Sequence, residues 1–306
     1  MIKNRNTINR RFVIILKKIK NFIYSLQTVG LKGMINLAKT KTAKISTQNL
    51  LSDVADLQKS SPLFRYATCN DMVWLMAQYP EYCRDDRDST RSTTWGLKSA
   101  GTLFCVNKII QLNPKKILEV GPGWNLHFDK HFGADHDYWI IDDATDIGWD
   151  QNSLKKFEAA VGERKHTNFV RGFMGSFQNQ LEDKCFDLVF SISVVEHVPA
   201  EKKRDFYRDI YRVLKPGGYM AHSIDIFDET LARAEFEVIK ETGFIIPSKP
   251  DLQVRVKPSE GNPTLFEDMW TVFHSYLGIN RPDKWENLRE IPGHQATLFV
   301  FAQKPA

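Results

Sequence analysis

The stretch Ile117-Leu-Glu-Val-Gly-Pro-Gly123 decides the fold, because it joins a short apolar strand to a glycine-containing turn. A helical pattern begins near Leu126, so the turn lies between a strand and a helix. Glycine lets the backbone come close to a ligand, and open α/β sheets bind ligands at the carboxyl ends of their strands. We therefore expect a ligand at Gly121 and Gly123, with the acidic side chain of Glu119 beside it.

A second apolar strand, Tyr138-Trp-Ile-Ile141, ends in Asp142 and Asp143 about 19 residues after the turn. A carboxylate at this place can accept hydrogen bonds from both hydroxyls of a ribose. Nicotinamide- and flavin-binding folds share this feature, but their fingerprint has a third glycine where Leu126 stands. Glu119 would also repel a pyrophosphate, whereas it would attract ammonium and sulfonium charges.

Strands and helices alternate from about residue 94 onward, which predicts a parallel sheet covered by helices. Two further motifs follow the first two: Phe186-Asp-Leu-Val-Phe-Ser-Ile-Ser-Val-Val-Glu-His-Val198 and Val213-Leu-Lys-Pro-Gly-Gly-Tyr219. In order and spacing, the four motifs resemble those of class I S-adenosylmethionine-dependent methyltransferases over about residues 94–228. The resemblance implies an α/β, Rossmann-like sheet of seven mostly parallel strands with helices on both faces. Gln295–Ala302 resembles one strand of that family's closing hairpin.

The resemblance also implies S-adenosylmethionine as the cofactor and assigns residues to each part of it. The methionine part would lie among Glu119, Gly121 and Gly123, the ribose by Asp142 and Asp143, and the methionine amine by backbone groups near Ser191.

Two positions depart from the family pattern. Asn125 stands at the third glycine, and asparagine tolerates left-handed backbone better than most residues. Phe173 stands where many members have an acidic residue that contacts the adenine amine. Contacts from Phe173 and Met174 would have to replace that interaction.

Candidate catalytic residues follow the later strands. Methyl transfer from a sulfonium is an in-line displacement, and a hydroxyl acceptor also needs a base. His197 follows the fourth predicted strand, and an imidazole suits this role. The alternative is that His197 only holds its loop. Asp225 is a second candidate at a strand end, and its alternative is to cap the helix that begins near Glu229.

No metal is expected. Ubiquinone-pathway O-methyltransferases supply metal ligands from Glu-x-x-Glu-His, but Ser193 replaces the first carboxylate in this chain. Two adjacent ligands would hold a metal weakly.

A further resemblance indicates the acceptor class. Ala221-His-Ser-Ile-Asp-Ile-Phe-Asp228 is similar to a pattern in methyltransferases of bacterial cell-surface polysaccharide pathways. We therefore expect O-methylation of a small-molecule or saccharide acceptor. Lipid or quinone methylation at a membrane surface is an alternative, and so is a non-catalytic cofactor-binding partner protein.

Charge is distributed unevenly along the 306 residues. Residues 1–52 contain eleven Lys or Arg and no Asp or Glu, whereas the whole chain has a net charge of +5. The remainder is mildly acidic, which argues against nucleic-acid binding. Residues 11–26 have the pattern of a basic amphipathic helix. Residues 1–30 could therefore contact an anionic membrane, or pack on the enzyme body or a second subunit.

Three regions are expected. They are a basic amphipathic extension over 1–47, a helical lead-in or cap over 48–113, and a methyltransferase domain over 114–306 with a late insertion near 245–293. The four cysteines form no CxxC pair, and no apolar run of about 18 residues occurs. These features favour a cytoplasmic location, peripheral at the inner membrane face if the N-terminal helix binds lipid.

Overall fold

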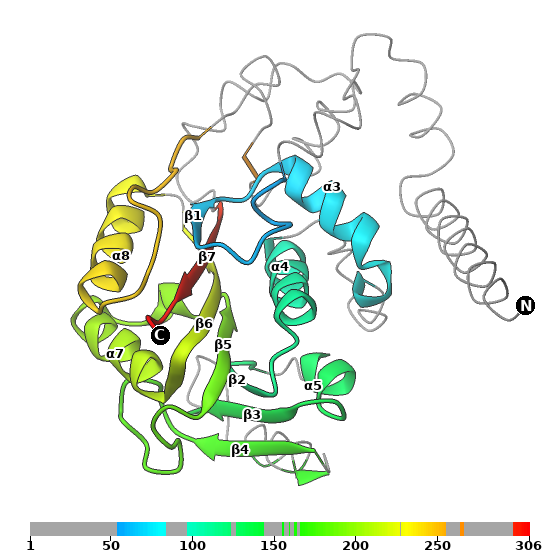
Figure 1. Ribbon diagram of the computed structural model, residues 1–306, viewed down its shortest axis with the longest axis vertical. Helices are drawn as coiled ribbons and strands as arrows, with labels where there is room; N and C mark the ends of the chain where they lie inside the picture. The colour runs from blue at the N-terminus through cyan, green and yellow to red at the C-terminus, as the bar shows by residue number, and fades with distance from the viewer. Residues whose placement is uncertain are drawn as a thin grey trace, which may run out of the picture.

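A seven-stranded sheet carries the structure, in the spatial order β1-β7-β6-β5-β2-β3-β4 (Figure 1). The computed structural model describes residues 54–83, 97–123, 127–143, 155, 159, 162–163, 166–226, 228–254, 264–265 and 296–306. The strands are β1 (Leu63–Tyr66), β2 (Lys116–Val120), β3 (Asp137–Asp142), β4 (Thr167–Arg171), β5 (Phe186–Ile192), β6 (Leu214–Asp225) and β7 (Thr297–Gln303). Neighbours from β4 to β6 are parallel, and β7 is antiparallel to both β6 and β1. The predicted Rossmann-like fold class is confirmed.

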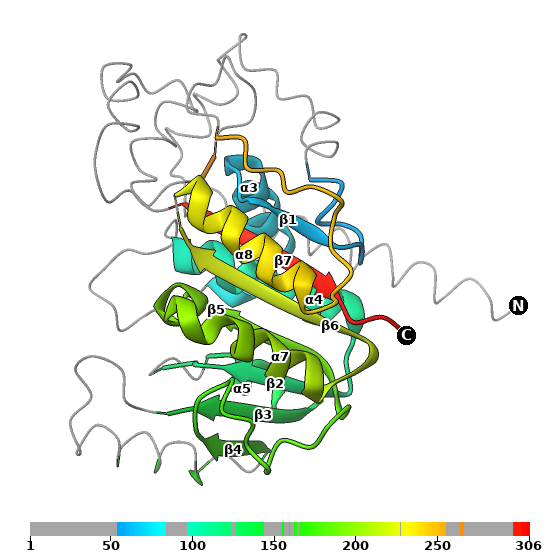
Figure 2. The same ribbon diagram turned by 90° about the vertical axis from the view of Figure 1, so that its left-hand side faces the viewer.

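Helices cover both faces of this sheet. One face carries α7 (Lys203–Val213) and α8 (Glu229–Glu241), and the other carries α4 (Leu97–Leu112) and α5 (His127–Phe132) (Figures 1 and 2). Helix α3 (Cys69–Gln78) packs on α4. Short 3₁₀ turns are η1 (Pro80–Cys83), η2 (Val195–His197) and η3 (Ala200–Lys202).

The central strands are apolar because both of their faces are covered. Ile117 and Leu118 of β2, and Val189 and Phe190 of β5, are fully buried. Continuous apolar runs of this kind are typical of parallel strands between two helical layers. The glycine turn after β2 and the segment after β5 therefore leave the sheet side by side.

Strand β6 alternates between the two faces, as its sequence predicts. His222 faces α7, where its ring centroid lies 6.1 Å from that of Tyr207. Ser223 faces α4 at Gly101, and a Cβ on Gly101 would lie 2.4 Å from the Ser223 hydroxyl oxygen. The missing side chain therefore lets α4 pack directly on β6.

The outer partner of β7 corrects one detail of the predicted fold. Strand β7 includes most of Gln295–Ala302, but it does not belong to a hairpin, because its two neighbours are β6 and β1. Leu63 pairs with Phe301 and Tyr66 with Leu298. All of β1 is buried and so covers the apolar edge of β7. The described part of 48–113 therefore contributes a strand and α4 to the same sheet; the domain limits themselves stay a prediction.

Arg65 ties β1 to α3. Its guanidinium donates to Asp56 and to Asp71, each at 2.6 Å, and the residue is 8% exposed. Asp71 also accepts the backbone N–H of Thr68 at 2.7 Å, and the Thr68 side chain caps α3. A guanidinium can bind two carboxylates in this way, and each buried charge is neutralised by the other.

Several predictions fall outside the described residues: the amphipathic helix over 11–26, Asn125, and most of the late insertion near 245–293. These stay predictions. Within the described ranges, no helix is long and apolar enough to cross a membrane.

We expect a chain that begins at Ser46 to fold and one that begins at Lys115 not to fold. The shorter chain lacks β1 and α4, whose Leu103, Phe104 and Ile109 are almost fully buried. Each such side chain contributes about 1.5–3 kcal/mol, against a total stability of only about 5–15 kcal/mol. Thermal unfolding followed by circular dichroism measures both chains. A cooperative transition in the shorter chain would contradict the role assigned to β1 and α4.

Candidate active site

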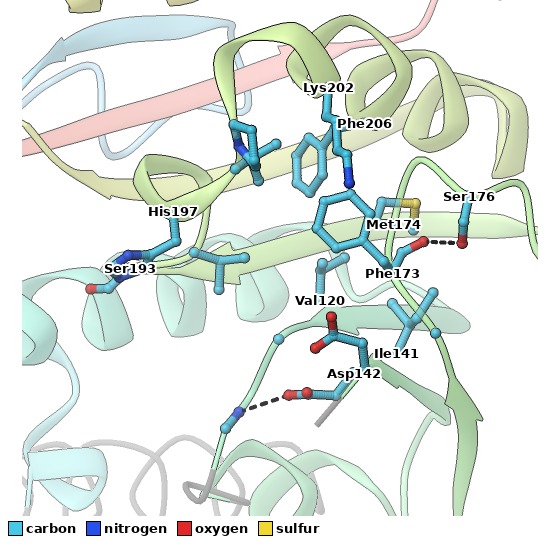
Figure 3. A pocket seen from close by; sticks show the side chains of 17 residues that line it. Val120, Ile141, Asp142, Phe173, Met174, Ser176, Ser193, His197, Lys202 and Phe206 are labelled. Atoms are coloured by element: carbon cyan, nitrogen blue, oxygen red, sulfur yellow. Dashed lines mark hydrogen bonds between the residues drawn. The ribbon is translucent and has the colours of Figure 1, made fainter. Parts of the chain in front are cut away.

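A cavity of about 580 Å³ opens at the carboxyl ends of β2 and β3 (Figure 3). The glycine turn, the loop after β4, and the segment from η2 to the start of α7 form its wall. Among the predicted site residues, the wall contains Gly121, Gly123, Asp142, Asp143, Phe173, Met174 and His197. Its size and position suit a small-molecule ligand, because such pockets typically measure about 300–1,000 Å³.

The glycine turn forms one side of the cavity. Gly121 and Gly123 have φ values of +63° and +59°, a region that disfavours side chains. A Cβ on Gly121 would also lie 2.8 Å from a methyl carbon of Val194. The turn therefore needs glycine at 121 for two independent reasons.

Asp142 ends β3 at the rim of the same turn. Its carboxylate accepts the backbone N–H of Gly123 at 3.2 Å, and the residue is 9% exposed (Figure 3). Its own carbonyl accepts the N–H of Gly172 at 3.1 Å, which joins β3 to the loop after β4. Asp143 follows in the wall. The structure thus brings the turn and both acidic residues together, as the sequence predicts.

The loop after β4 supplies Phe173 and Met174. The Lys202 ammonium lies 5.8 Å from the centre of the Phe173 ring, and Phe206 of α7 completes this side (Figure 3). Lys202 of η3 and Phe206 of α7 were not predicted from the sequence. No local motif marks them, since they reach the wall only through the packing of this segment against the sheet.

Glu119 and Ser191 lie behind the wall rather than in it. Glu119 is 4% exposed, and its carboxylate accepts the Tyr138 hydroxyl at 2.6 Å. Burial raises the pKa of Glu119 to about 8, although the Tyr138 hydrogen bond opposes this. Ser191 is fully buried, and its hydroxyl lies 2.7 Å from Nδ1 of His222.

Ser193 lines the cavity instead of Ser191. Its φ is +51°, an uncommon value for a residue other than glycine. Its N–H donates to the carbonyl of Ser223 at 2.9 Å, and its hydroxyl donates to Asp225 at 2.6 Å. The position could have been identified from the sequence by its place one residue beyond the strand end.

His197 lies in η2 with its side chain 74% exposed, and its Nε2 is 4.0 Å from a carboxylate oxygen of Glu196. Burial and the charge of Asp225 raise the pKa of Glu196 to about 8. Asp225 itself is not among the wall residues. It does not cap the following helix either: Asp228 caps α8 by accepting the N–H groups of Thr230 and Leu231.

Metal ligands are not grouped in the part of the chain that the structure describes: no three His, Cys, Asp or Glu side chains there are arranged to hold an ion.

Residues 118–222 match the family model of a methyltransferase domain, about a third of the chain. Every residue that lines the cavity lies within this range. No curated protein sequence matches the chain.

Solved structures with a similar fold share little sequence with this chain. An S-adenosylmethionine-dependent methyltransferase from Mesorhizobium loti is 17% identical, with a TM-score of 0.43, over 68% of this chain and 100% of that one. A phosphoethanolamine N-methyltransferase 2 from Haemonchus contortus, in complex with phosphomonomethylethanolamine and S-adenosylhomocysteine, is 17% identical with a TM-score of 0.39, over 65% and 53%. The [4+2]-cyclase SpnF is 16% identical with a TM-score of 0.41, over 62% and 75%.

The domain match bears out the predicted enzyme class, a methyltransferase, and its predicted cofactor, S-adenosylmethionine.

We expect Glu119→Gln to change how stability depends on pH. The raised pKa of Glu119, about 8 instead of 4.5, means that the folded protein keeps a proton that the unfolded chain releases between these values. The stability that protonated Glu119 contributes is fully present below pH 4.5. It is lost by about 1.4 kcal/mol per pH unit as the pH rises from 4.5 to about 8. The variant should therefore gain stability relative to the wild type from about pH 5 to about pH 8.

Urea unfolding at the two pH values measures this difference. Glu196 titrates in both proteins and cancels from the comparison. A stability difference that is independent of pH would show that Glu119 ionises normally in the folded protein.

Proposed function

We propose that this S-adenosylmethionine-dependent methyltransferase transfers the methyl group to a hydroxyl of a small-molecule or saccharide acceptor. The observation that carries the proposal is the position of His197. Its exposed side chain lines the cavity, as Ser193 does, and lies on the side of the cavity away from Asp142 (Figure 3). A ribose at Asp142 would leave the His197 side open to an acceptor, and a base at that place is what O-methylation requires.

The wall residues fit the cofactor. Chain neighbours aside, no described residue has an atom within 4 Å of a Cβ placed on Gly123, so there is space beside it in the cavity wall. Asp142 would hold the ribose hydroxyls, and Phe173 and Met174 would contact the adenine. Glu119 lies behind the wall and would attract the ammonium and sulfonium charges of the cofactor. When bound, S-adenosylmethionine supplies a methyl group on a sulfonium.

Two polar side chains, His197 and Ser193, line the proposed acceptor side of the cavity, and Asp225 lies behind Ser193. His197 would accept the proton of the reacting hydroxyl. Ser193 donates its own hydrogen to Asp225, so its oxygen keeps lone pairs that can accept a bond from a second acceptor hydroxyl. Asp225 therefore acts through Ser193 in this proposal, and a sugar with neighbouring hydroxyls suits the pair.

Two features of the sequence extend the proposal. The likeness of Ala221–Asp228 to methyltransferases of cell-surface polysaccharide pathways supports a saccharide acceptor. The basic residues within 1–30 would bring the enzyme to an anionic membrane surface on the cytoplasmic side.

We expect Asp142→Ala to weaken binding of S-adenosylhomocysteine by about 1.5–3 kcal/mol, the effect of leaving ribose hydroxyls unpaired in a mostly closed site. Calorimetry measures the affinity, and Asp143→Ala is the matched control from the next position. A larger loss in Asp143→Ala than in Asp142→Ala would move the ribose contact to Asp143.

We expect His197→Ala to lower turnover by about 10²-fold or more, with cofactor affinity and melting temperature unchanged because the side chain is exposed. The assay measures S-adenosylhomocysteine release and methylated product by mass, on a panel of glycosides, sugar nucleotides and small hydroxyl compounds. Loss of cofactor binding would favour a scaffold role for His197. Methylation of amines in place of hydroxyls would overturn the proposed reaction.

A further inference from the structure

The loop after β4 is fastened to α7 by one buried carboxylate. Asp209 is fully buried, and its Oδ2 accepts the backbone N–H of Gly175 at 2.8 Å and that of Phe177 at 3.0 Å. A carboxylate oxygen that accepts N–H groups forms strong, charge-assisted hydrogen bonds. The middle of the loop is thus fixed by a side chain that the proposed reaction does not use.

Arg212 completes this attachment one turn further along α7. Its Nε donates to Oδ1 of Asp209 at 2.9 Å, and its Nη1 donates to the carbonyl of Leu181 at 2.7 Å. The guanidinium neutralises the buried carboxylate and also holds the end of the loop. Because a buried charge without its partner is costly, the two side chains form one unit.

The other end of this loop forms the cavity wall. Gly172 donates its backbone N–H to the carbonyl of Asp142, and the wall residues Phe173 and Met174 follow it in the chain. Gly175 then turns with a φ of +102°, and a Cβ there would lie 2.9 Å from the backbone nitrogen of Phe206. The backbone of the loop is therefore in close contact with α7 directly after the two wall residues.

We propose that Asp209 is a positioning residue for the adenine half of the cofactor, acting through the backbone of Gly175 and Phe177 on Phe173 and Met174. The inference rests on the cofactor position given under the proposed function. Residues 172–177 of this loop, with a phenylalanine at 173, contain no carboxylate that could bind the adenine amine. Recognition then depends on the shape and backbone groups of the loop, which Asp209 fixes.

Asp209→Asn tests the proposal, because the amide keeps the shape but removes the negative charge that pairs with Arg212. We expect binding of S-adenosylhomocysteine, measured by calorimetry, to weaken about tenfold or more. The preference for S-adenosylhomocysteine over S-inosylhomocysteine should also fall, which a loss of stability alone would not cause. Gly175→Ala disturbs the same loop while keeping the Asp209–Arg212 pair, and should have the same two effects.

Asp187 is the matched control. It accepts the N–H groups of Lys115 and Lys116, at 2.9 and 2.8 Å, and forms an ion pair with Lys215 at 2.5 Å. This arrangement resembles that of Asp209, but it lies at the amino ends of β2 and β5, and the cavity lies at the carboxyl ends of the strands. Asp187→Asn should lower the melting temperature and leave both the affinity and the base preference unchanged.

Wild-type affinity and base preference in folded Asp209→Asn would overturn the proposal, as would equal losses in Asp187→Asn. If Asp209→Asn does not fold, Gly175→Ala decides in the same way. Substitutions at the ribose contact distinguish a wrong cofactor position from a wrong positioning role for Asp209. Unchanged affinity in both Asp142→Ala and Asp143→Ala would overturn the cofactor position and this inference with it, whereas a loss in either of them without an effect of Asp209→Asn would overturn the positioning role alone.

Discussion

Left-handed backbone at Gly121 is the constraint on which the cavity depends. The turn after β2 and the segment after β5 leave neighbouring strands of one parallel sheet, so they must pass each other at close range. They do so because residue 121 has no side chain where Val194 packs. This contact brings the glycine turn and Asp142 into the same cavity as η2 and His197. A larger residue at 121 would separate the cofactor half of the site from the acceptor half.

Buried acidic groups around the cavity differ in what neutralises them. Asp209 accepts two backbone N–H groups and pairs with Arg212, and Asp142 accepts the N–H of Gly123. Glu119 and Glu196 differ from these two, because burial raises the pKa of each to about 8. A sulfonium and an ammonium near Glu119 would favour its charged form, so cofactor binding there would be coupled to ionisation of this carboxyl.

The sequence allowed the prediction of those features that are set by local pattern. Strands β2 and β3 and the turn between β2 and α5 follow from apolar runs, glycines and the acidic residues at the strand end. The pairing of β1 with β7 could not be predicted, because a strand of four residues has too little sequence pattern to specify its neighbour. The family resemblance also suggested that β7 belongs to a hairpin. Lys202, Phe206 and Asp209 were missed for a related reason. Each acts through a contact between segments that only the folded chain brings together.

The two halves of the cavity are built by different means. On the proposed cofactor side, backbone groups and buried carboxylates would hold the ligand: the glycine turn, Asp142 at its rim, and the loop that Asp209 contacts. Changing any of these disturbs the fold as well as the site. On the acceptor side, the groups that face the cavity are exposed or near its surface, as His197 is. Substitutions there alter few buried contacts, so a protein built this way can change its acceptor while its cofactor site stays the same.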